Sequence, residues 1–163
     1  VVFCKDIKHS VPCTEGTVFV SPDAGGVVRA RKFAEKFYSD VAIVDKRRPK
    51  AGVAEVMNLI GDVEGKHEIL VDEIVDSGGT LSNAAKAIMD AGALSVRAYI
   101  THGVLSNGAN KKIDASVLDE LVISDSIPMQ HTSKKIRQVT VAELFGEAMR
   151  RITNEESVSS LFK

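Results

Sequence analysis

The chain has 163 residues, of which 44% are apolar and 26% charged, and this composition excludes a disordered tail and a membrane bundle. At roughly 150 residues per domain, this length predicts one domain that can bury a core without disulfides. The 21 basic and 22 acidic side chains leave a net charge of −1, so we expect no nucleic-acid partner and only a local anion site.

We expect no targeting signal at the beginning of the chain as given. Residues 1–4, Val-Val-Phe-Cys, are too short for the apolar core of a signal peptide, and no apolar run approaches the roughly 20 residues of a membrane-spanning helix. We therefore expect no membrane partner. Cys4 and Cys13 fit neither a disulfide framework nor a zinc spacing, which is typical of thiols in a reducing cytoplasm. The chain does not begin with Met, so we expect a processed product or an excised fragment.

Three short apolar strands and one helix are predicted in the first half. The strands cover residues 17–20, 41–44 and 56–60. The helix is indicated by apolar residues at helical spacing, namely Val27, Ala30, Ala34 and Phe37. Glycines at 25 and 26 interrupt the pattern after the first strand, and the charged segment 45–52 interrupts it after the second.

The second half continues the alternation of strands and helices. A strand begins at 69–71, and two more are predicted at 96–100 and 121–123. One helix would follow residue 80 and end near Gly92, with a stripe of Leu81, Ala84, Ala85 and Ile88. Thr140 and Glu143 have capping-box spacing before a last helix, whose stripe is Val141, Leu144, Phe145, Ala148 and Ile152.

This alternation predicts an α/β fold with three layers, in which helices flank a mostly parallel sheet. Such sheets bind ligands beyond the carboxyl ends of their strands. Both glycine-bearing turns, at 25–26 and 78–79, are expected at that edge.

The most informative stretch is 71–80, where three carboxylates follow an apolar strand and precede a helix. Gly78 and Gly79 would let the backbone approach a ligand, and the free N–H groups of the helix start suit a phosphate. The hydroxyls of Ser77 and Thr80 add further donors. The adjacent acids at 72 and 73 could accept hydrogen bonds from sugar hydroxyls, directly or through a divalent metal. The pattern favours a sugar-phosphate site over the simpler interpretation of an acidic turn with a helix cap.

Residues 71–80 resemble the ribose-5-phosphate loop of the type I phosphoribosyltransferase fold. The chain from about Val18 to its end resembles the ribose-phosphate pyrophosphokinase (phosphoribosyl pyrophosphate synthetase) family. Segments 21–31, 45–50 and 155–162 are similar to family segments and occur in family order. The resemblance implies a phosphoribosyltransferase-like domain at 17–163, after a segment 1–16 that matches no family motif.

The resemblance also implies a reaction, the transfer of pyrophosphate from MgATP to the 1-hydroxyl of ribose 5-phosphate, which gives phosphoribosyl pyrophosphate and AMP. Asp72 and Glu73 would hold the ribose hydroxyls, and Lys46 and Arg48 would close over the ATP phosphates. Asp23 matches a carboxylate that binds the metal, which is Mg²⁺. The 5-phosphate would be held by Asp76, Ser77, Gly78, Gly79 and Thr80. Family members assemble as dimers and hexamers, so a homo-oligomer is implied.

The chain departs from the family in ways that leave its activity open. It matches only the second of two similar halves, and the other half carries much of the ATP-binding surface. Glu73 stands where Asp is usual, Ser77 where Thr is common, and Gly52 where Asn is frequent. We expect ribose 5-phosphate to bind, whereas turnover by this chain alone stays open.

Two alternatives remain. A phosphoribosyltransferase would share the sugar-phosphate site but would not require the basic segment 46–49 or the tail 155–162. A noncatalytic sugar-phosphate-binding partner or regulator would not need Lys46 and Arg48. Taken alone, the basic segment is typical of a solvated surface loop. His102 ends a predicted strand and resembles a family position near the site, although without that resemblance the pattern favours a structural histidine.

Overall fold

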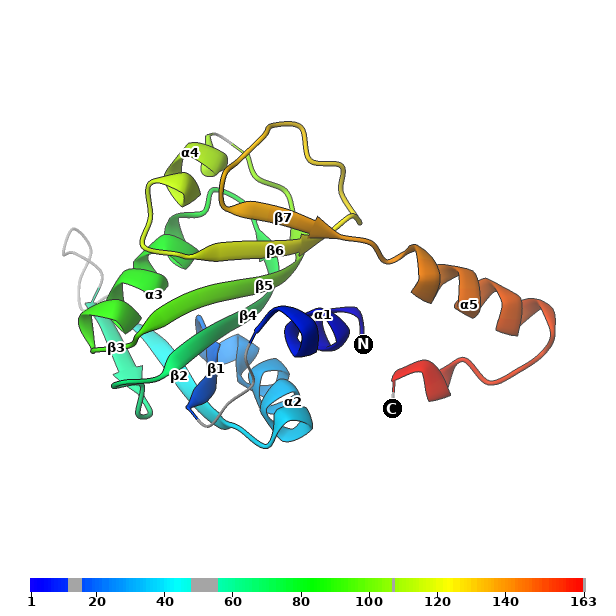
Figure 1. Ribbon diagram of the computed structural model, residues 1–163, viewed down its shortest axis with the longest axis horizontal. Helices are drawn as coiled ribbons and strands as arrows, with labels where there is room; N and C mark the ends of the chain where they lie inside the picture. Colours follow the sequence, from blue (N-terminus) through cyan, green and yellow to red (C-terminus); the bar gives the residue numbers. More distant parts are fainter. Residues whose placement is uncertain (12–15, 48–55, 107, 163) are drawn as a thin grey trace.

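The computed structural model describes residues 1–11, 16–47, 56–106 and 108–162, which form a seven-stranded sheet with helices on both faces (Figure 1). The strand order is β3-β2-β1-β4-β5-β6-β7. The strands are β1 (Thr17–Ser21), β2 (Asp40–Arg47), β3 (Val56–Ile60), β4 (His67–Val75), β5 (Ser95–Gly103), β6 (Glu120–Ser124) and β7 (Ile136–Val139). The predicted α/β fold with a mostly parallel sheet is confirmed.

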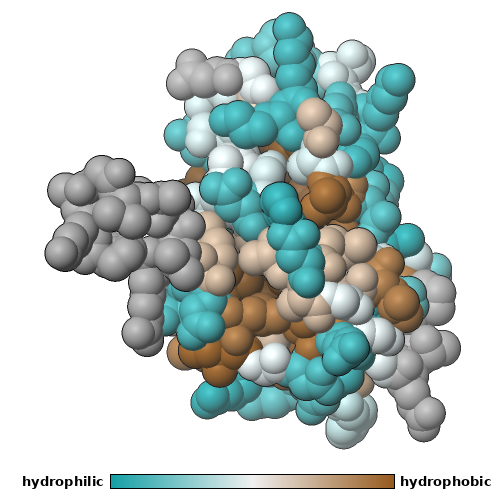
Figure 2. All heavy atoms as spheres, turned by 90° about the vertical axis from the view of Figure 1, so that its left-hand side faces the viewer, coloured by the Kyte–Doolittle hydropathy of each residue, from teal (hydrophilic) through white to brown (hydrophobic). Residues whose placement is uncertain are grey.

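The pair β2–β3 is antiparallel, whereas the other neighbouring strands are parallel. A parallel connection needs a crossover of roughly a dozen residues or more, and the chain between Arg47 and Val56 is shorter. The simple rule that alternating elements pair in parallel therefore fails at this edge. Figure 2 views the molecule from the side on which β3 lies, and hydrophobic side chains gather there among hydrophilic ones. In β3, Met57 and Leu59 pack partly buried against the core.

Helices cover the two faces of the sheet (Figure 1). On one face lie α1 (Val2–Ser10) and α2 (Val27–Phe37), and on the other lie α3 (Gly79–Asp90) and α4 (Ala109–Asp114). The central strands are buried on both sides because their residues alternate between two hydrophobic clusters. In β1, Phe19 packs with α1 and α2, whereas Val18 and Val20 pack on the side of α3.

The segment without a family motif contributes to the core through α1. Ile7 is fully buried against the sheet, and the Asp6 carboxylate accepts hydrogen bonds from Tyr99 and Arg137 at 2.9 and 2.8 Å. The guanidinium of Arg137 holds the pKa of Asp6 below its usual value. These bonds tie α1 to β5 and β7. Cys4 lies on the same helix as a free, half-buried thiol, and Cys13 lies outside the described residues.

The last helix, α5 (Ala142–Thr153), projects away from the sheet beyond β7 (Figure 1). Its position in the sequence agrees with the prediction, but the described part of the chain buries none of its residues. The predicted capping box is wrong, because the Thr140 hydroxyl accepts from the Ala142 N–H at 3.1 Å and Glu143 pairs with Lys5. The short helix η2 (Ser159–Phe162) follows, in a tail that Arg151 anchors by donating to the carbonyl of Ser157.

Among the described residues, no helix is long and apolar enough to span a lipid bilayer. The part of the fold that matters for chemistry is the carboxyl edge of the sheet. There β1 and β4 are parallel neighbours, so the turn after β1, which forms the short helix η1 (Ala24–Gly26), lies beside the turn after β4. The sequence predicts both turns at this edge, but not that β1 and β4 are neighbouring strands.

Candidate functional site

Two carboxylates lie close to the carboxyl end of β4, and an arginine from α2 bridges them. Asp72 is half-buried and Glu73 is exposed. The Arg29 guanidinium lies 3.0 Å from the Asp72 carboxylate and 2.8 Å from that of Glu73. The backbone N–H of Glu73 also donates to Asp72 Oδ1 at 2.7 Å. The acid pair is therefore held in one orientation before any ligand arrives.

The role of Arg29 is not predicted from the sequence. Helical periodicity separates apolar from polar residues and does not show which polar residues pair with one another. The relevant signal is topological. Arg29 follows the turn after β1, and β1 neighbours β4, so the first turn of α2 faces the end of β4.

Burial raises the pKa of Asp72, and the nearby carboxylates of Asp23 and Glu73 raise it further. The Glu73 N–H and the Arg29 guanidinium act in the opposite direction. Three carboxylates with one bridging guanidinium leave an excess of negative charge. Hydroxyl donors or a cation would relieve it.

Asp23 occupies the turn after β1. Its side chain accepts from the Gly26 N–H at 2.9 Å, and its carbonyl accepts from the Ser21 hydroxyl at 2.6 Å. A Cβ at Gly26 would come within 2.5 Å of the Ser21 hydroxyl oxygen, so glycine is required for this close turn. The turn thus holds the Asp23 carboxylate near Asp72.

The second glycine turn connects β4 to α3 and contains the residues predicted to hold a phosphate. Gly78 immediately precedes α3 with φ of +72°, a left-handed conformation that favours glycine. The first turn of α3 contains no acidic residue, and its N–H groups and helix dipole suit an anion. Ser77 and Thr80 are exposed beside it, and Gly79 is the first residue of the helix.

The turn at residues 76–79 is braced from behind by the segment that follows β5, which includes α4. The Ser106 hydroxyl donates to the Asp76 carboxylate, and the Lys112 ammonium donates to the Ser77 carbonyl at 3.0 Å. A Cβ at Gly78 would lie 3.3 Å from the side chain of Ile113 in α4. Neither Ser106 nor Lys112 is predicted from the sequence, because neither belongs to a recognisable motif.

The structure describes part of one predicted catalytic cation, Lys46, and does not describe the other, Arg48. Lys46 lies near the carboxyl end of β2, where its backbone pairs with Met57, but its side chain is outside the described part of the structure. Arg48 and Gly52 fall outside the described residues altogether. Since β2 is parallel to β1, its end reaches the same edge as the acid pair. His102 also lies near that edge, with its ring 2.9 Å from the Ser126 hydroxyl, which is a structural contact.

The described residues hold no group of three or more His, Cys, Asp or Glu side chains suited to binding a metal ion. Magnesium, however, is commonly held by one or two carboxylates together with waters and substrate oxygens. The proximity of Asp23 to Asp72, whose pKa it raises, fits this second kind of site. The donor set is compatible with Mg²⁺ that arrives with a substrate.

The mostly parallel sheet with helices on both faces belongs to the phosphoribosyltransferase-like class of α/β folds. A purine phosphoribosyltransferase from Pyrococcus horikoshii has this fold, with a TM-score of 0.54 at 17% identity over 86% of this chain and 85% of that one. A phosphoribosylpyrophosphate synthetase from Mycobacterium smegmatis is more similar. Its TM-score is 0.84 at 27% identity, over 94% of this chain and 50% of that one.

The chain belongs to the family of the phosphoribosyl synthetase-associated domain, whose sequence profile matches residues 46–163. Two curated relatives are both called ribose-phosphate pyrophosphokinase. The one from Hyphomonas neptunium is 59% identical over 165 residues, covering 99% of this chain and 53% of the relative. The one from Maricaulis maris is 57% identical over 152 residues, covering 91% and 49%. The chain thus spans about half the length of the curated relatives it matches.

Proposed function

We propose that this chain provides the ribose-5-phosphate-binding half of a ribose-phosphate pyrophosphokinase. The observation that carries the proposal is the placement of the acid pair beside the glycine turn at the start of α3. This arrangement offers acceptors to a diol and amide donors to a phosphate within one continuous segment of chain. The curated relatives carry the name of that activity and share more than half of their aligned residues with this chain.

In the proposed complex, the carboxylates of Asp72 and Glu73 accept hydrogen bonds from the ribose hydroxyls. The amides and hydroxyls of residues 76–80 hold the 5-phosphate. Together these contacts orient the sugar so that its 1-hydroxyl faces the carboxyl end of β2. Catalysis of phosphoryl-type transfer depends on such positioning and on positive charge around the transferred group.

ATP is the proposed donor of the pyrophosphate group, with Lys46 and Arg48 neutralising charge on its phosphates. Asp23 and Asp72 would hold the accompanying Mg²⁺, which supplies Lewis-acid stabilisation of phosphate oxygens when bound. This chain's own contribution is to orient the sugar hydroxyl and to offer cations to the transferred group. Release of AMP from MgATP and ribose 5-phosphate measures whether this half acts alone.

Calorimetric titration with ribose 5-phosphate tests the site itself. We expect saturable binding that weakens about tenfold or more in Asp72→Asn, since the variant loses a charged acceptor and its pairing with Arg29. Asp90→Asn is the matched control, because this exposed aspartate lies at the far end of α3 and pairs with Lys86. The proposal fails if the chain does not bind ribose 5-phosphate, or if both variants bind it equally well.

A phosphoribosyltransferase is the second candidate, and the similarity to the Pyrococcus horikoshii structure favours keeping it. It would transfer the phosphoribosyl group of phosphoribosyl pyrophosphate to a purine or pyrimidine base and release pyrophosphate. Pyrophosphate release that depends on an added base, without any AMP release from MgATP, would select it. A noncatalytic sugar-phosphate-binding regulator would show binding with neither reaction.

We further propose that the chain associates into a homo-oligomer. The support is the outer face of α5, where Phe145, Met149 and Ile152 are 56, 64 and 67% exposed. Exposed apolar side chains gathered on one helix are typical of a protein interface.

A further inference from the structure

Arg29 contacts its two carboxylate partners through separate nitrogens, and this geometry makes it the counter-cation of both acids. Nη1 lies 3.0 Å from the Asp72 carboxylate, and Nη2 lies 2.8 Å from that of Glu73. An arginine that pairs with one carboxylate in the strong bidentate manner presents two nitrogens to it. The guanidinium is shared here, so it neutralises neither acid fully.

A third carboxylate lies beside the same guanidinium. A Cβ at Gly26 would come within 3.3 Å of Arg29 Nη1 and 3.7 Å of Asp23 Oδ1, so both side chains flank one point of the turn after β1. Asp23 is also close enough to Asp72 to raise its pKa. We call Asp23, Asp72 and Glu73 the acid cluster. Its negative charge exceeds the single positive charge of the guanidinium.

Partial burial makes the charges at this point interact strongly. The side chains of Arg29 and Asp72 are 27% and 30% exposed, whereas that of Glu73 is 69% exposed. The interaction between two charges grows as the effective dielectric constant falls, and this constant is lower at partly buried positions than in bulk water. The guanidinium therefore repels a second cation that approaches the same carboxylates.

Several oxygens of the acid cluster already accept hydrogen bonds. Asp72 Oδ1 accepts from Arg29 at 3.0 Å and from the Glu73 N–H at 2.7 Å. Asp23 Oδ1 accepts from the Gly26 N–H at 2.9 Å. Magnesium requires octahedral coordination by oxygen, and it commonly completes its shell with waters and substrate oxygens. On the acid cluster alone, a divalent cation would compete with Arg29 for carboxylate charge.

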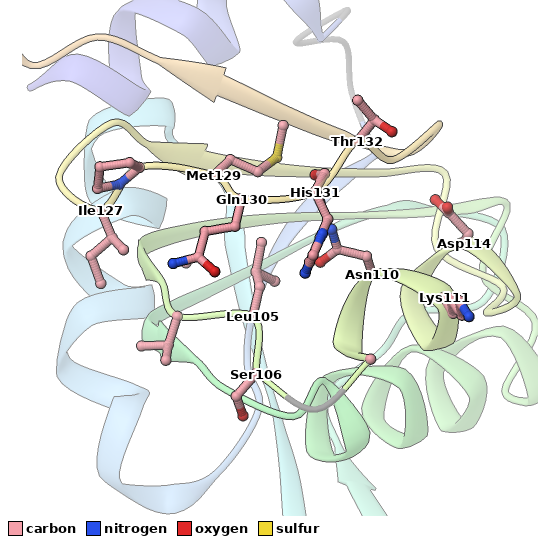
Figure 3. Close-up of a pocket in the computed structure, with 14 residues that line it drawn as sticks. Leu105, Ser106, Asn110, Lys111, Asp114, Ile127, Met129, Gln130, His131 and Thr132 are labelled. Atoms are coloured by element: carbon pink, nitrogen blue, oxygen red, sulfur yellow. Dashed lines mark hydrogen bonds between the residues drawn. The ribbon is translucent and has the colours of Figure 1, made fainter.

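The neighbouring cavity offers no comparable group of acids. It has a volume of about 810 Å³ and opens between the segments after β5 and β6 (Figure 3). Among its described lining residues the one carboxylate is that of Asp114, which lies at the end of α4, away from Ser106. This carboxylate accepts from the Ser133 hydroxyl and the Lys134 N–H at 2.5 and 3.1 Å. The acid cluster is the better cation site of the two.

We propose that Arg29 competes with the divalent cation for the acid cluster, so that the cation binds tightly only together with a substrate. The guanidinium weakens binding of the cation alone, and the hydroxyl and phosphate oxygens of a substrate add ligands that offset the repulsion. Arg29 is then a positioning residue that couples metal binding to substrate binding and acts through Asp72. The inference rests on the proposed function for the identity of the substrate, but not for the competition itself.

Binding of Mn²⁺ alone to the full chain tests the competition, with the electron paramagnetic resonance signal of the free ion as the readout. Mn²⁺ prefers the same oxygen ligands as Mg²⁺. We expect Arg29→Gln to bind Mn²⁺ at least about tenfold more tightly than the parent chain. Arg31→Gln is the matched control, because it removes an exposed arginine from the same helix. Thermal unfolding verifies that each variant is folded.

Two further substitutions separate the charge of Arg29 from its structural contacts. Arg29→Lys keeps the positive charge, so its affinity for Mn²⁺ should stay close to that of the parent chain. Combined with Arg29→Gln, Asp23→Asn should remove the gain in affinity, whereas Asp90→Asn at the far end of α3 should keep it. The proposal is overturned if Arg29→Gln binds Mn²⁺ no more tightly than Arg31→Gln, if Arg29→Lys behaves like Arg29→Gln, or if Asp23→Asn keeps the gain.

Ribose 5-phosphate distinguishes a failure of this inference from a failure of the proposed function. At saturation, the sugar should tighten Mn²⁺ binding by the parent chain, and the tightening should be smaller in Arg29→Gln, where there is less repulsion to offset. If the sugar does not bind and Arg29→Gln still gains affinity for Mn²⁺, the proposed function fails and the competition stands. If the sugar binds and Arg29→Gln gains nothing, the competition alone is refuted.

Discussion

At the scale of single residues, the candidate site depends on glycines that no other residue replaces and on acids that a neighbour orients. Gly26 leaves room for the Ser21 hydroxyl, and Gly78 adopts a positive φ directly before α3. Arg29 then fixes the acids at the end of β4. Each of these roles can be tested by one substitution.

Gly78→Ala should destabilise the chain by roughly 1–2 kcal/mol, because an L-residue pays that penalty in the left-handed conformation. The added Cβ would also press on Ile113, so the affinity for ribose 5-phosphate should fall. Denaturant unfolding and calorimetry measure the two effects. Gly65→Ala is the control, since Gly65 has φ of +70° with open space around its Cβ among the described atoms. Equal ligand affinity in the two variants would contradict the assigned role.

Glu68 in β4 is a buried carboxyl group that makes the stability of the chain depend on pH. It is 1% exposed, and neither carboxylate oxygen has a hydrogen-bond partner within the described ranges. Burial raises the pKa of Glu68 to about 8, although Lys66 acts against this shift. Since the pKa in the folded state lies above the ordinary value of 4.5, folding is unaffected below that pH and loses stability as the pH rises toward 8.

Glu68→Gln should therefore unfold at nearly the same temperature as the parent chain at pH 4.5 and at a higher temperature at pH 8.5. The stability difference at the upper pH should approach roughly 4 kcal/mol. Thermal unfolding across this pH range provides the measurement. A constant difference at all pH values would show that the carboxyl group does not ionise in the manner described.

Most of the proposed site residues come from the segment 71–80, which is continuous in sequence. The acids, the glycines and the hydroxyls are neighbours there, so no knowledge of tertiary structure was needed. Arg29, Ser106 and Lys112 act on this segment from other elements, and local patterns do not reveal such contacts.

At the scale of elements, long and regular apolar patterns predicted structure well. The stripe in α3 and the runs in β1, β4 and β5 agree with the observed elements. The missed elements lack such a pattern. In β7 only Ile136 is buried, and α4 has six residues, so neither produces a periodic signal. In α1 the buried residue is Ile7, one position in nine.

The position of α1 depends on its ion pair with β7. Asp6→Asn should lower the free energy of unfolding by about 1–2 kcal/mol at neutral pH, because it breaks a bidentate contact with Arg137. The pKa of Asp6 is depressed, so this contribution is present above the ordinary value of 3.8 and is lost as the pH falls below it.

Thermal unfolding at pH 7 and at pH 3 measures the contribution of Asp6. The control is Glu143→Gln, which removes an exposed pair with Lys5 at 3.7 Å and should change stability little. If the two variants are equally stable at neutral pH, the Asp6 bridge does not anchor α1.

At the scale of the whole molecule, the fold of this chain does not explain the apolar face of α5, since none of the residues of this helix is buried among the described residues. Its apolar stripe was predicted correctly as a pattern, yet the stripe does not pack against the described core. A pattern of this kind shows that a face is apolar but does not identify what covers it. This chain spans about half the length of its curated relatives, and packing partners can lie outside it.

If α5 forms a contact between copies, Ile152→Lys should shift the chain toward the monomer in analytical ultracentrifugation. A charged ammonium would have to be buried in the contact, which is costly. Val28→Lys is the matched control, since Val28 on α2 is also 67% exposed. A parent chain that sediments as a monomer at all concentrations would contradict the proposed assembly.

The brace behind the turn at Gly78 and Gly79 has a thermodynamic consequence for the proposed phosphate site. Because Ser106 and Lys112 already anchor the turn, capture of an anion requires little loss of backbone freedom. The heat released on capture should consequently be offset by only a small entropic penalty. Loosening the brace would reduce affinity through that penalty even though no group touching the ligand had changed.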